Sequence, residues 1–136
     1  MSKYLKNLIS KVNNPDAAIV SEGLEGADVT GFIDTGSYAL NALLSGSLFG
    51  GLPNNKISCL AGDPATGKTF YAIGIAGQFL KDHKDGVVIY FDTEQAVTSD
   101  MFTARGVDPE RVAVIPVATI EEFKTQALKI VNDILE

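Results

Sequence analysis

The segment Gly62-Asp63-Pro64-Ala65-Thr66-Gly67-Lys68-Thr69 says more about the fold than any other part of this chain. It fits the pattern G-x-x-x-x-G-K-[ST], in which glycines let the backbone curl until its N–H groups point at phosphate oxygens. The helix that comes after such a loop places its positive N-terminal end at the same spot. We therefore predict a nucleotide site over this whole segment, with Lys68 reaching the β- and γ-phosphates and Thr69 offering its hydroxyl to Mg²⁺.

The residues on either side agree with this interpretation. Lys56–Ala61 is a short apolar run that enters the glycine loop, and we predict a strand there. Residues 69–81 repeat apolar side chains at helical spacing and are predicted to form a helix. A chance glycine turn with a surface lysine is the alternative, but such a turn does not require a strand before it and a helix after it.

Further strands and helices alternate along the rest of the chain. Strands are predicted over 86–91 and 112–117, and a short helix over 99–105. A capping box opens a last helix at Thr119. The side chains expected to face inward from that helix are Phe123, Ala127, Ile130 and Ile134. Alternating strands and helices predict an α/β fold with a mostly parallel sheet flanked by helices, as in P-loop NTPases.

The N-terminal part differs from the rest of the chain. Residues 1–31 are predicted to hold a helix over 3–12 and an acidic, glycine-containing linker, and residues 32–136 the nucleotide-binding core. At the start of the core we expect a short strand at Phe32-Ile33, a helix through Leu44 and then a glycine-rich loop over 45–55.

Two carboxylates come after the predicted strand 86–91. Asp92 and Glu94 lie where that strand ends, and the carboxyl ends of parallel strands face the ligand crevice. One of them could hold Mg²⁺ and the other could deprotonate an attacking water. Loop carboxylates on a solvated edge are the alternative. The residues alone leave open which carboxylate takes which role.

The composition limits the classes of molecule that this protein is expected to bind. The net charge is -6, with 11 lysines and arginines against 17 acidic residues, which argues against a strongly basic nucleic-acid binder. No apolar run reaches a membrane span, and the N-terminus lacks the core of a secretory signal, so we expect a cytoplasmic protein without a membrane partner. Aromatic side chains are expected mostly in the core, at Phe70, Tyr71, Phe79, Tyr90, Phe91 and Phe123.

Several of these segments together resemble the RecA-like recombinase family. Residues 33–37 (IDTGS) and 50–53 (GGLP), followed by the phosphate loop, resemble the opening of the family's core. Residues 91–94 (FDTE) fit the strand end that carries the family's water-activating glutamate. Residues 106–112 (GVDPERV) are similar to phage UvsX-type recombinases in particular. The combination is specific, although each segment except the phosphate loop is weak alone.

The resemblance implies a role for individual residues. Glu94 would activate water, and Asp92 would be its partner at the strand end. Thr98 and Met101 would lie near the adenine of ATP, with Mg²⁺ as the second cofactor. Lys3–Val12 resembles the arm that packs on the adjacent protomer of a helical filament, which makes the protein its own partner.

The resemblance also implies that some parts of the family's protein are missing here. The Walker B aspartate, the loops that contact DNA and the residues that sense the γ-phosphate would come after Glu136, so we expect a core truncated before the Walker B strand. The expected function is the ATP-binding part of a recombination and repair ATPase that forms filaments on single-stranded DNA and promotes strand exchange. Single-stranded DNA would bind through regions outside this chain, in a phage-infected bacterial cell. The 136-residue chain alone is expected to lack hydrolysis. The alternatives are a RecA-like helicase or clock-type ATPase, and a nucleotide-binding or oligomer-capping module without turnover.

Overall fold

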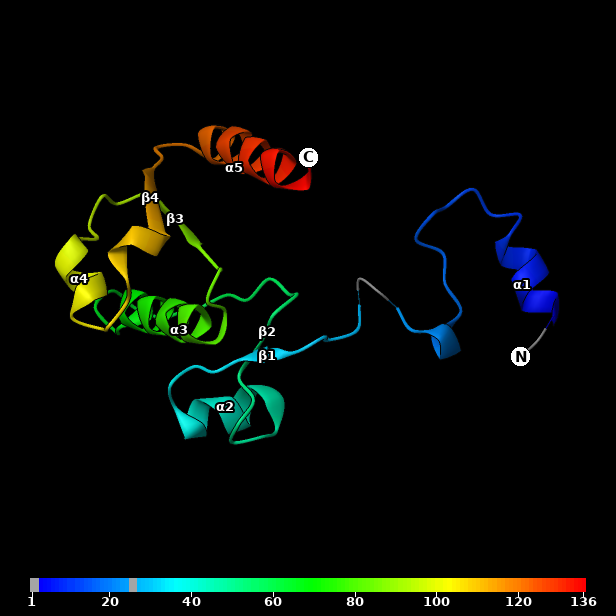
Figure 1. The fold of residues 1–136 in the computed structure, drawn as a ribbon, viewed down its shortest axis with the longest axis horizontal. Coiled ribbons are helices and arrows are strands. Elements are labelled where there is room, and N and C mark those ends of the chain that lie inside the picture. The colour runs from blue at the N-terminus through cyan, green and yellow to red at the C-terminus, as the bar shows by residue number, and fades with distance from the viewer. Residues whose placement is uncertain (1–2, 25–26) are drawn as a thin grey trace.

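The computed structural model describes residues 3–24 and 27–136. These residues form an α/β structure with five α-helices and two short sheets (Figure 1). The elements in chain order are α1 (Lys3–Ile9), η1 (Val20–Glu22), β1 (Phe32–Ile33), α2 (Tyr38–Ser45), β2 (Leu52–Pro53), α3 (Lys68–Asp82), β3 (Val88–Asp92), α4 (Ser99–Thr103), η2 (Pro109–Arg111), β4 (Val112–Pro116) and α5 (Ile120–Leu135). None of the helices in the described ranges is long and apolar enough to cross a bilayer.

The core lies between α3 and the β3–β4 pair. The two strands are parallel, with Val88 opposite Val112 and Asp92 opposite Pro116, so both carboxyl ends lie at one edge. The buried core residues are Ile73, Leu80, Phe102 and Val107, from α3, α4 and the turn after α4. Val88 and Tyr90 are two positions apart on β3, so both face this cluster and pack against it.

The opposite face of β3 meets α5. The rings of Phe91 and Phe123 pack edge to face, 4.8 Å apart between centroids. Thr119 caps α5 by accepting the N–H of Glu122 at 3.1 Å, as the capping box predicts. The Glu122 carboxylate accepts from the N–H of Ala118 instead of the N-cap residue itself. Helices therefore lie on both faces of the parallel pair.

A second small unit is built on β1, β2 and α2. The strands are antiparallel, and Ser37 caps α2 by accepting the N–H of Leu40. Gly51 is required where the strands meet, because its φ is +140° and a Cβ there would lie 2.0 Å from the Ile33 carbonyl oxygen. The glycine-rich segment 45–55, expected to be loop throughout, thus contains β2.

A buried asparagine ties this unit together. Asn41 is 1% exposed, and its Oδ1 accepts from the Thr35 hydroxyl at 2.6 Å and the Thr35 N–H at 3.0 Å. Its amide nitrogen donates to Asp34 Oδ1 at 2.8 Å and to the Leu48 carbonyl at 3.0 Å. The bond from Asn41, and next the N–H of Gly36, lower the pKa of Asp34. The network joins α2 to the segment after β1.

We expect Asn41→Leu to lower the free energy of unfolding by about 2–4 kcal/mol, because it removes the hydrogen-bond partner of the buried Thr35 N–H and of the Leu48 carbonyl. The dependence of the free energy of unfolding on pH is expected to change as well. The folded-state pKa of Asp34 is below its ordinary 3.8, so this stabilisation is complete above that pH and is lost as pH falls through the folded-state value. Urea denaturation at several pH values measures both effects, and the exposed Asn132→Leu is the control. Equal stability of the two variants would contradict the role of this network.

Arg111 joins the start of β4 to the end of α3. Its guanidinium donates to the carbonyls of Leu80 at 2.9 Å and Gly86 at 3.0 Å, and also to that of His83. The last carbonyls of a helix lack intrahelical partners, and a cation at that end also complements the helix dipole. Arg111 therefore helps to hold α3, and with it the phosphate loop, against the parallel pair.

The predicted strand Lys56–Ala61 is not formed. Residues 57–63 are irregular, and Ile57 is fully exposed. A strand exists only where its backbone pairs with a neighbour, and β3 pairs only with β4 among the described residues. The mostly parallel sheet expected from the sequence is therefore represented by one parallel pair, while β1–β2 is antiparallel.

Side-chain burial also departs from expectation. No residue of α5 is buried, and Phe123 and Ile134 of its predicted inner face are exposed. Phe70 and Tyr71, expected in the core, are exposed as well. A helix buries its apolar stripe only against another element, and only Phe123 of α5 has an aromatic partner within the described ranges.

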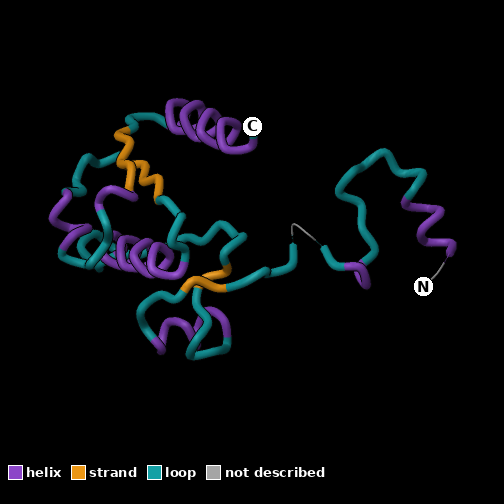
Figure 2. Tube along the Cα trace, in the orientation of Figure 1, coloured by secondary structure: helices purple, strands orange, loops and turns teal. Residues whose placement is uncertain are grey.

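The N-terminal segment lies apart from the rest (Figures 1 and 2). Helix α1 has no buried residue and ends at Ile9, three residues before the predicted end. Lys6 and Glu22 form an ion pair at 3.0 Å within this segment. Residues 1, 2, 25 and 26 of the predicted arm lie outside the described residues.

Candidate functional site

The phosphate loop forms a turn before α3. Ala65 and Gly67 have φ values of +63° and +91°, the left-handed region that permits such a curl. The Thr66 hydroxyl donates to the Asp63 carbonyl at 2.8 Å and closes the turn. The N-cap of α3 is Gly67, which offers no side-chain hydrogen bond, so its first-turn N–H groups have no cap from that residue. This is the arrangement that binds phosphate oxygens.

Lys68 extends back over the loop. Its ammonium donates to the carbonyls of Gly62 and Asp63, each at 2.8 Å. These bonds hold the positive charge beside the uncapped start of α3. Two sources of positive potential, the ammonium and the helix end, therefore converge on one place.

Asp92 shapes the loop after β3. It is 6% exposed, and its Oδ1 accepts from the N–H groups of Glu94 at 3.1 Å and Gln95 at 3.0 Å. Its Oδ2 accepts from the N–H of Val97 at 3.2 Å. The loop includes Gln95 at φ +53°, a conformation that such bonds stabilise. With both carboxylate oxygens so engaged, the geometry favours Asp92 as an organiser of this loop over Asp92 as a metal ligand.

Glu94 lies beside the phosphate loop. A cavity of about 350 Å³ is lined by Glu94, Lys68 and Thr69, together with Pro64, Ala65 and Gly67. Residues predicted from two separate motifs are thus brought into one site. A carboxylate in this position could accept a proton from a water that approaches a bound phosphate.

The two residues expected near adenine lie in different surroundings. Met101 lines a cavity of about 180 Å³ that also includes Thr69 and Glu94. Thr98 instead lines a hollow of about 250 Å³ against β4, with Phe102 and Val114 among its walls. Of the two, Met101 shares a cavity with Thr69 of the phosphate loop, and the adenine roles of both Met101 and Thr98 stay predictions.

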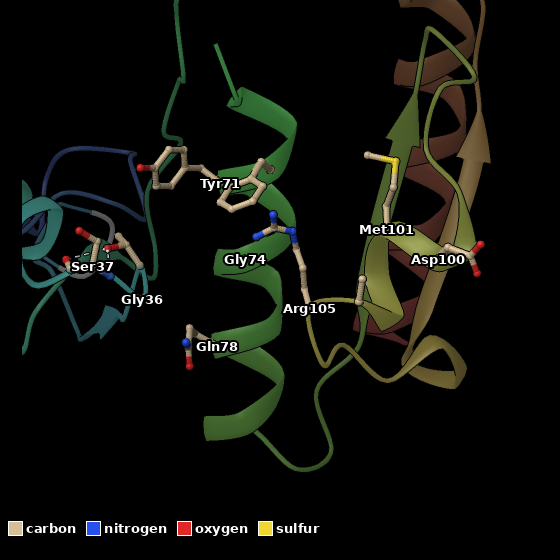
Figure 3. A pocket seen from close by; sticks show the side chains of 11 residues that line it. Gly36, Ser37, Tyr71, Gly74, Gln78, Asp100, Met101 and Arg105 are labelled. Carbon is tan, nitrogen blue, oxygen red and sulfur yellow. Dashed lines mark hydrogen bonds between the residues drawn. The ribbon is translucent and has the colours of Figure 1, made fainter. Parts of the chain in front are cut away.

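Met101 also borders a wider hollow of about 930 Å³ between α3, α4 and the start of α2 (Figure 3). The guanidinium of Arg105 lies 3.0 Å from the centre of the Phe70 ring, and the rings of Phe70 and Tyr71 meet edge to face. Figure 3 shows the Arg105 side chain lying against α3 near Gly74. Both aromatics are expected in the core from the sequence, and no sequence motif assigns a role to Arg105.

Tyr90 is the other site residue that sequence reasoning missed. It was assigned to the core, and its ring does pack edge to face on Phe102 at 5.9 Å. Its side chain, however, also lines the cavity of about 180 Å³ that includes Thr69 and Glu94. Burial, and then the charges of Asp92 and Glu94, raise the pKa of Tyr90. The sequence feature that could have indicated this is the alternation of side chains along β3, which puts Tyr90 on the same face as Asp92.

The site fits a nucleotide with a divalent cation better than a metal held by protein alone. Within residues 3–24 and 27–136, no group of three or more histidine, cysteine or acidic side chains could hold a metal ion. The Thr69 hydroxyl is a single oxygen ligand. Magnesium commonly completes its shell with nucleotide phosphates and water, which suits a site of this composition.

Comparisons with known proteins agree with the motifs. No family model matches the chain. It is 29% identical over 85 residues to the "Recombination and repair protein" of Enterobacteria phage T4, 62% of this chain and 22% of that protein. It is 34% identical over 102 residues to "Protein RecA" of Nautilia profundicola, a match that covers 74% of this chain and 26% of that protein. It is 30% identical over 101 residues to "DNA repair protein recA homolog 3, mitochondrial" of Arabidopsis thaliana, a match that covers 74% of this chain and 21% of that protein.

These matches confirm the similarity to RecA-like recombination and repair proteins, including one from a phage. The matched region spans about a quarter of the length of each of these curated relatives.

Proposed function

We propose that this chain is the ATP-binding part of a RecA-like ATPase that acts in DNA recombination and repair. The observation that carries the proposal is the cavity lined by Lys68, Thr69 and Glu94 at the start of α3. A cation, a hydroxyl and a carboxylate beside a helix N-terminus are the groups that phosphoryl transfer requires. The names of the relatives, which describe recombination, repair and RecA, support the cellular role.

Each residue has a distinct task in this proposal. The backbone N–H groups of the loop 62–67 and the Lys68 ammonium bind the phosphates. The Thr69 hydroxyl orients the divalent cation, and Glu94 orients an attacking water and accepts its proton. ATP with Mg²⁺, when bound, supplies the phosphoryl group and the charge that screens it. Asp92 positions Glu94 through the N–H bonds that shape the loop.

The fold and partners extend the proposal. The parallel pair β3–β4 with helices on both faces would be part of a RecA-like, mostly parallel sheet. Residues 1–31 would be an arm that joins copies into a filament, because Tyr4, Leu5 and Leu8 of α1 are exposed and offer apolar surface. We further propose that the assembled protein acts on single-stranded DNA in the cytoplasm of a phage-infected cell.

Nucleotide binding and turnover test the proposal. The chain is titrated with a fluorescent ATP analogue in Mg²⁺, and phosphate release is followed with and without single-stranded DNA. We expect binding that requires Mg²⁺. Absence of binding would contradict the proposal. Because the 136-residue chain alone is expected to lack hydrolysis, binding without turnover agrees with the proposal and with a nucleotide-binding module alike. Turnover coupled to duplex unwinding would favour the helicase alternative.

We expect the 136-residue chain to bind single-stranded DNA weakly, with a Kd above about 10⁻⁶ M at low salt. Affinity for DNA comes largely from lysines and arginines that neutralise phosphates, and this chain has a net charge of -6. Exposed Phe70 and Tyr71 offer stacking surface, but Arg105, which lies over the Phe70 ring, is the one cation placed there in the contacts described. Fluorescence anisotropy with a labelled oligonucleotide measures the affinity. Tighter binding that weakens steeply with salt would show that a DNA site lies within this chain.

A further inference from the structure

Two asparagines fasten the end of the N-terminal segment to the residues that follow β2. The backbone N–H of Asn54 donates to the Gly31 carbonyl at 3.1 Å, and its side-chain Oδ1 accepts from the Thr30 hydroxyl at 2.8 Å. The side-chain amide of Asn55 donates to the Asp28 carbonyl at 2.6 Å. We call these three bonds the asparagine clasp. Its two side-chain bonds join residues 24 and 27 positions apart in the sequence.

The clasp begins where the β1–β2 pair stops. Phe32 lies opposite Pro53, and proline has no N–H to donate across a pair of strands. The clasp bonds continue the pairing beyond this proline and keep residues 28–31 beside Asn54 and Asn55. The N-terminal segment is therefore fastened to the core at the point where it meets the small antiparallel unit.

Further contacts continue from the clasp out to α1. Asp28 is bonded on both sides, since its carbonyl accepts from Asn55 and its Oδ2 accepts from the N–H of Leu24 at 2.7 Å. Glu22 in turn forms the ion pair with Lys6 of α1 at 3.0 Å. Figures 1 and 2 show α1 lying apart from the core. The N-terminal segment is thus held by a series of polar contacts that starts at the clasp.

We propose that the asparagine clasp sets the direction in which the arm leaves the core, so that α1 is presented to a second copy of this chain. This inference rests on the proposed function, in which residues 1–31 join copies of the protein. Residues 3–12 carry three lysines and no acidic residue, whereas the whole chain has 17 acidic residues against 11 basic ones. A positively charged helix with exposed apolar side chains is complementary to an acidic partner, and a second copy is such a partner.

The clasp acts by lowering the cost of ordering the arm. Association immobilises the segments at an interface, and this ordering costs free energy unless they are already held in place. Loss of one hydrogen bond of the clasp should therefore weaken self-association by roughly threefold to tenfold. Nucleotide affinity should not change, because neither asparagine lines the cavity that contains Lys68, Thr69 and Glu94.

The test makes the same substitution at two neighbouring positions of the whole chain. Asn55→Asp removes the amide that donates to the Asp28 carbonyl, so it breaks the clasp. Asn54→Asp adds the same charge but keeps an acceptor for the Thr30 hydroxyl, so it is the matched control. Sedimentation equilibrium measures self-association. We expect the dissociation constant to rise by roughly threefold to tenfold in Asn55→Asp and to match the parent in Asn54→Asp.

A distance measurement reports the direction of the arm itself. One spin label is placed on the exposed Cys59 and another on α1 through Asn7→Cys. At a concentration where the chain is monomeric, we expect a narrow distribution of distances in the parent and in Asn54→Asp, and a broad one in Asn55→Asp. A clasp that only stabilised the fold would lower the melting temperature without broadening the distribution.

The outcomes separate the inference from the proposed function. If the parent self-associates and both variants do so equally well, the inference is overturned and the arm keeps its role. An equally narrow distribution in Asn55→Asp overturns the inference even where the melting temperature falls. A parent chain that stays monomeric at every concentration overturns the inference and the role of the arm together. Binding of the ATP analogue then still decides the nucleotide site separately.

Discussion

In a full-length version of the protein, replacing Glu94 with glutamine is expected to lower the rate of ATP hydrolysis by roughly 10²–10⁴-fold, the usual cost of losing a general base. The substitution keeps the size of the side chain and removes its ability to accept a proton. The N–H of Glu94 still donates to Asp92, so the loop keeps its shape. Affinity for the nucleotide is therefore expected to stay within a factor of about two, because the Lys68 and backbone contacts are intact. Phosphate release at saturating nucleotide measures the effect.

Two variants sharpen this experiment. Glu121→Gln, on the first turn of α5, is the control for loss of a carboxylate outside the cavity. Asp92→Asn should impair both binding and hydrolysis, since an amide cannot accept all three N–H bonds that shape the loop. Hydrolysis abolished in Asp92→Asn but intact in Glu94→Gln would make Asp92 the proton acceptor and the assignment of Glu94 wrong.

Lys68→Ala is expected to weaken binding of the ATP analogue by about 10- to 100-fold, the worth of a charge-assisted hydrogen bond to phosphate. The variant also loses the two bonds from Lys68 to the carbonyls of Gly62 and Asp63. The turn itself should survive, because the Thr66 hydroxyl still bonds to Asp63. Titration with a fluorescent analogue, at matched Mg²⁺, measures the change in Kd.

Lys129→Ala on α5 removes the same charge away from the cavity and serves as the control. If Lys68→Ala and Lys129→Ala bind the analogue equally well, Lys68 does not contact the phosphates. The phosphate loop would then be a turn without a nucleotide, and the proposed function would fail with it.

Much of the local structure could be predicted from the sequence because it depends on neighbours in the chain. Helix α3 begins at Lys68, one residue from the predicted start, and β3 and β4 lie within one or two residues of their predicted ranges. The cap at Thr119 was readable because a cap bonds to an N–H three residues away. The strand at 56–61 failed for the opposite reason, since it needs a partner that no local pattern supplies.

In the candidate site, too, some features could be predicted from neighbouring residues and others depend on the folded structure. The phosphate-loop pattern alone predicted Lys68 and Thr69, and the position after a strand predicted that Glu94 would face them; both meet at one cavity. The sequence could not separate Asp92 from Glu94, because the two carboxylates differ only in what surrounds them after folding. After folding, three N–H groups converge on Asp92 while Glu94 lines the cavity with Lys68, and the assignment of their roles stays a prediction.

The α/β pattern, the phosphate loop with its helix, the strand-end carboxylates and the similarity to RecA-like proteins were all readable from the order of the residues. The folded chain was needed to show that Asn41 and Arg111 bind distant carbonyls, and that Tyr90 lines a cavity with Thr69 and Glu94. The difference lies in the range of the interactions. Helix bonds, caps and tight turns join residues a few positions apart and depend on contiguous sequence. Strand pairing and side-chain hydrogen bonds join segments from anywhere in the chain, so they exist only once the elements have packed.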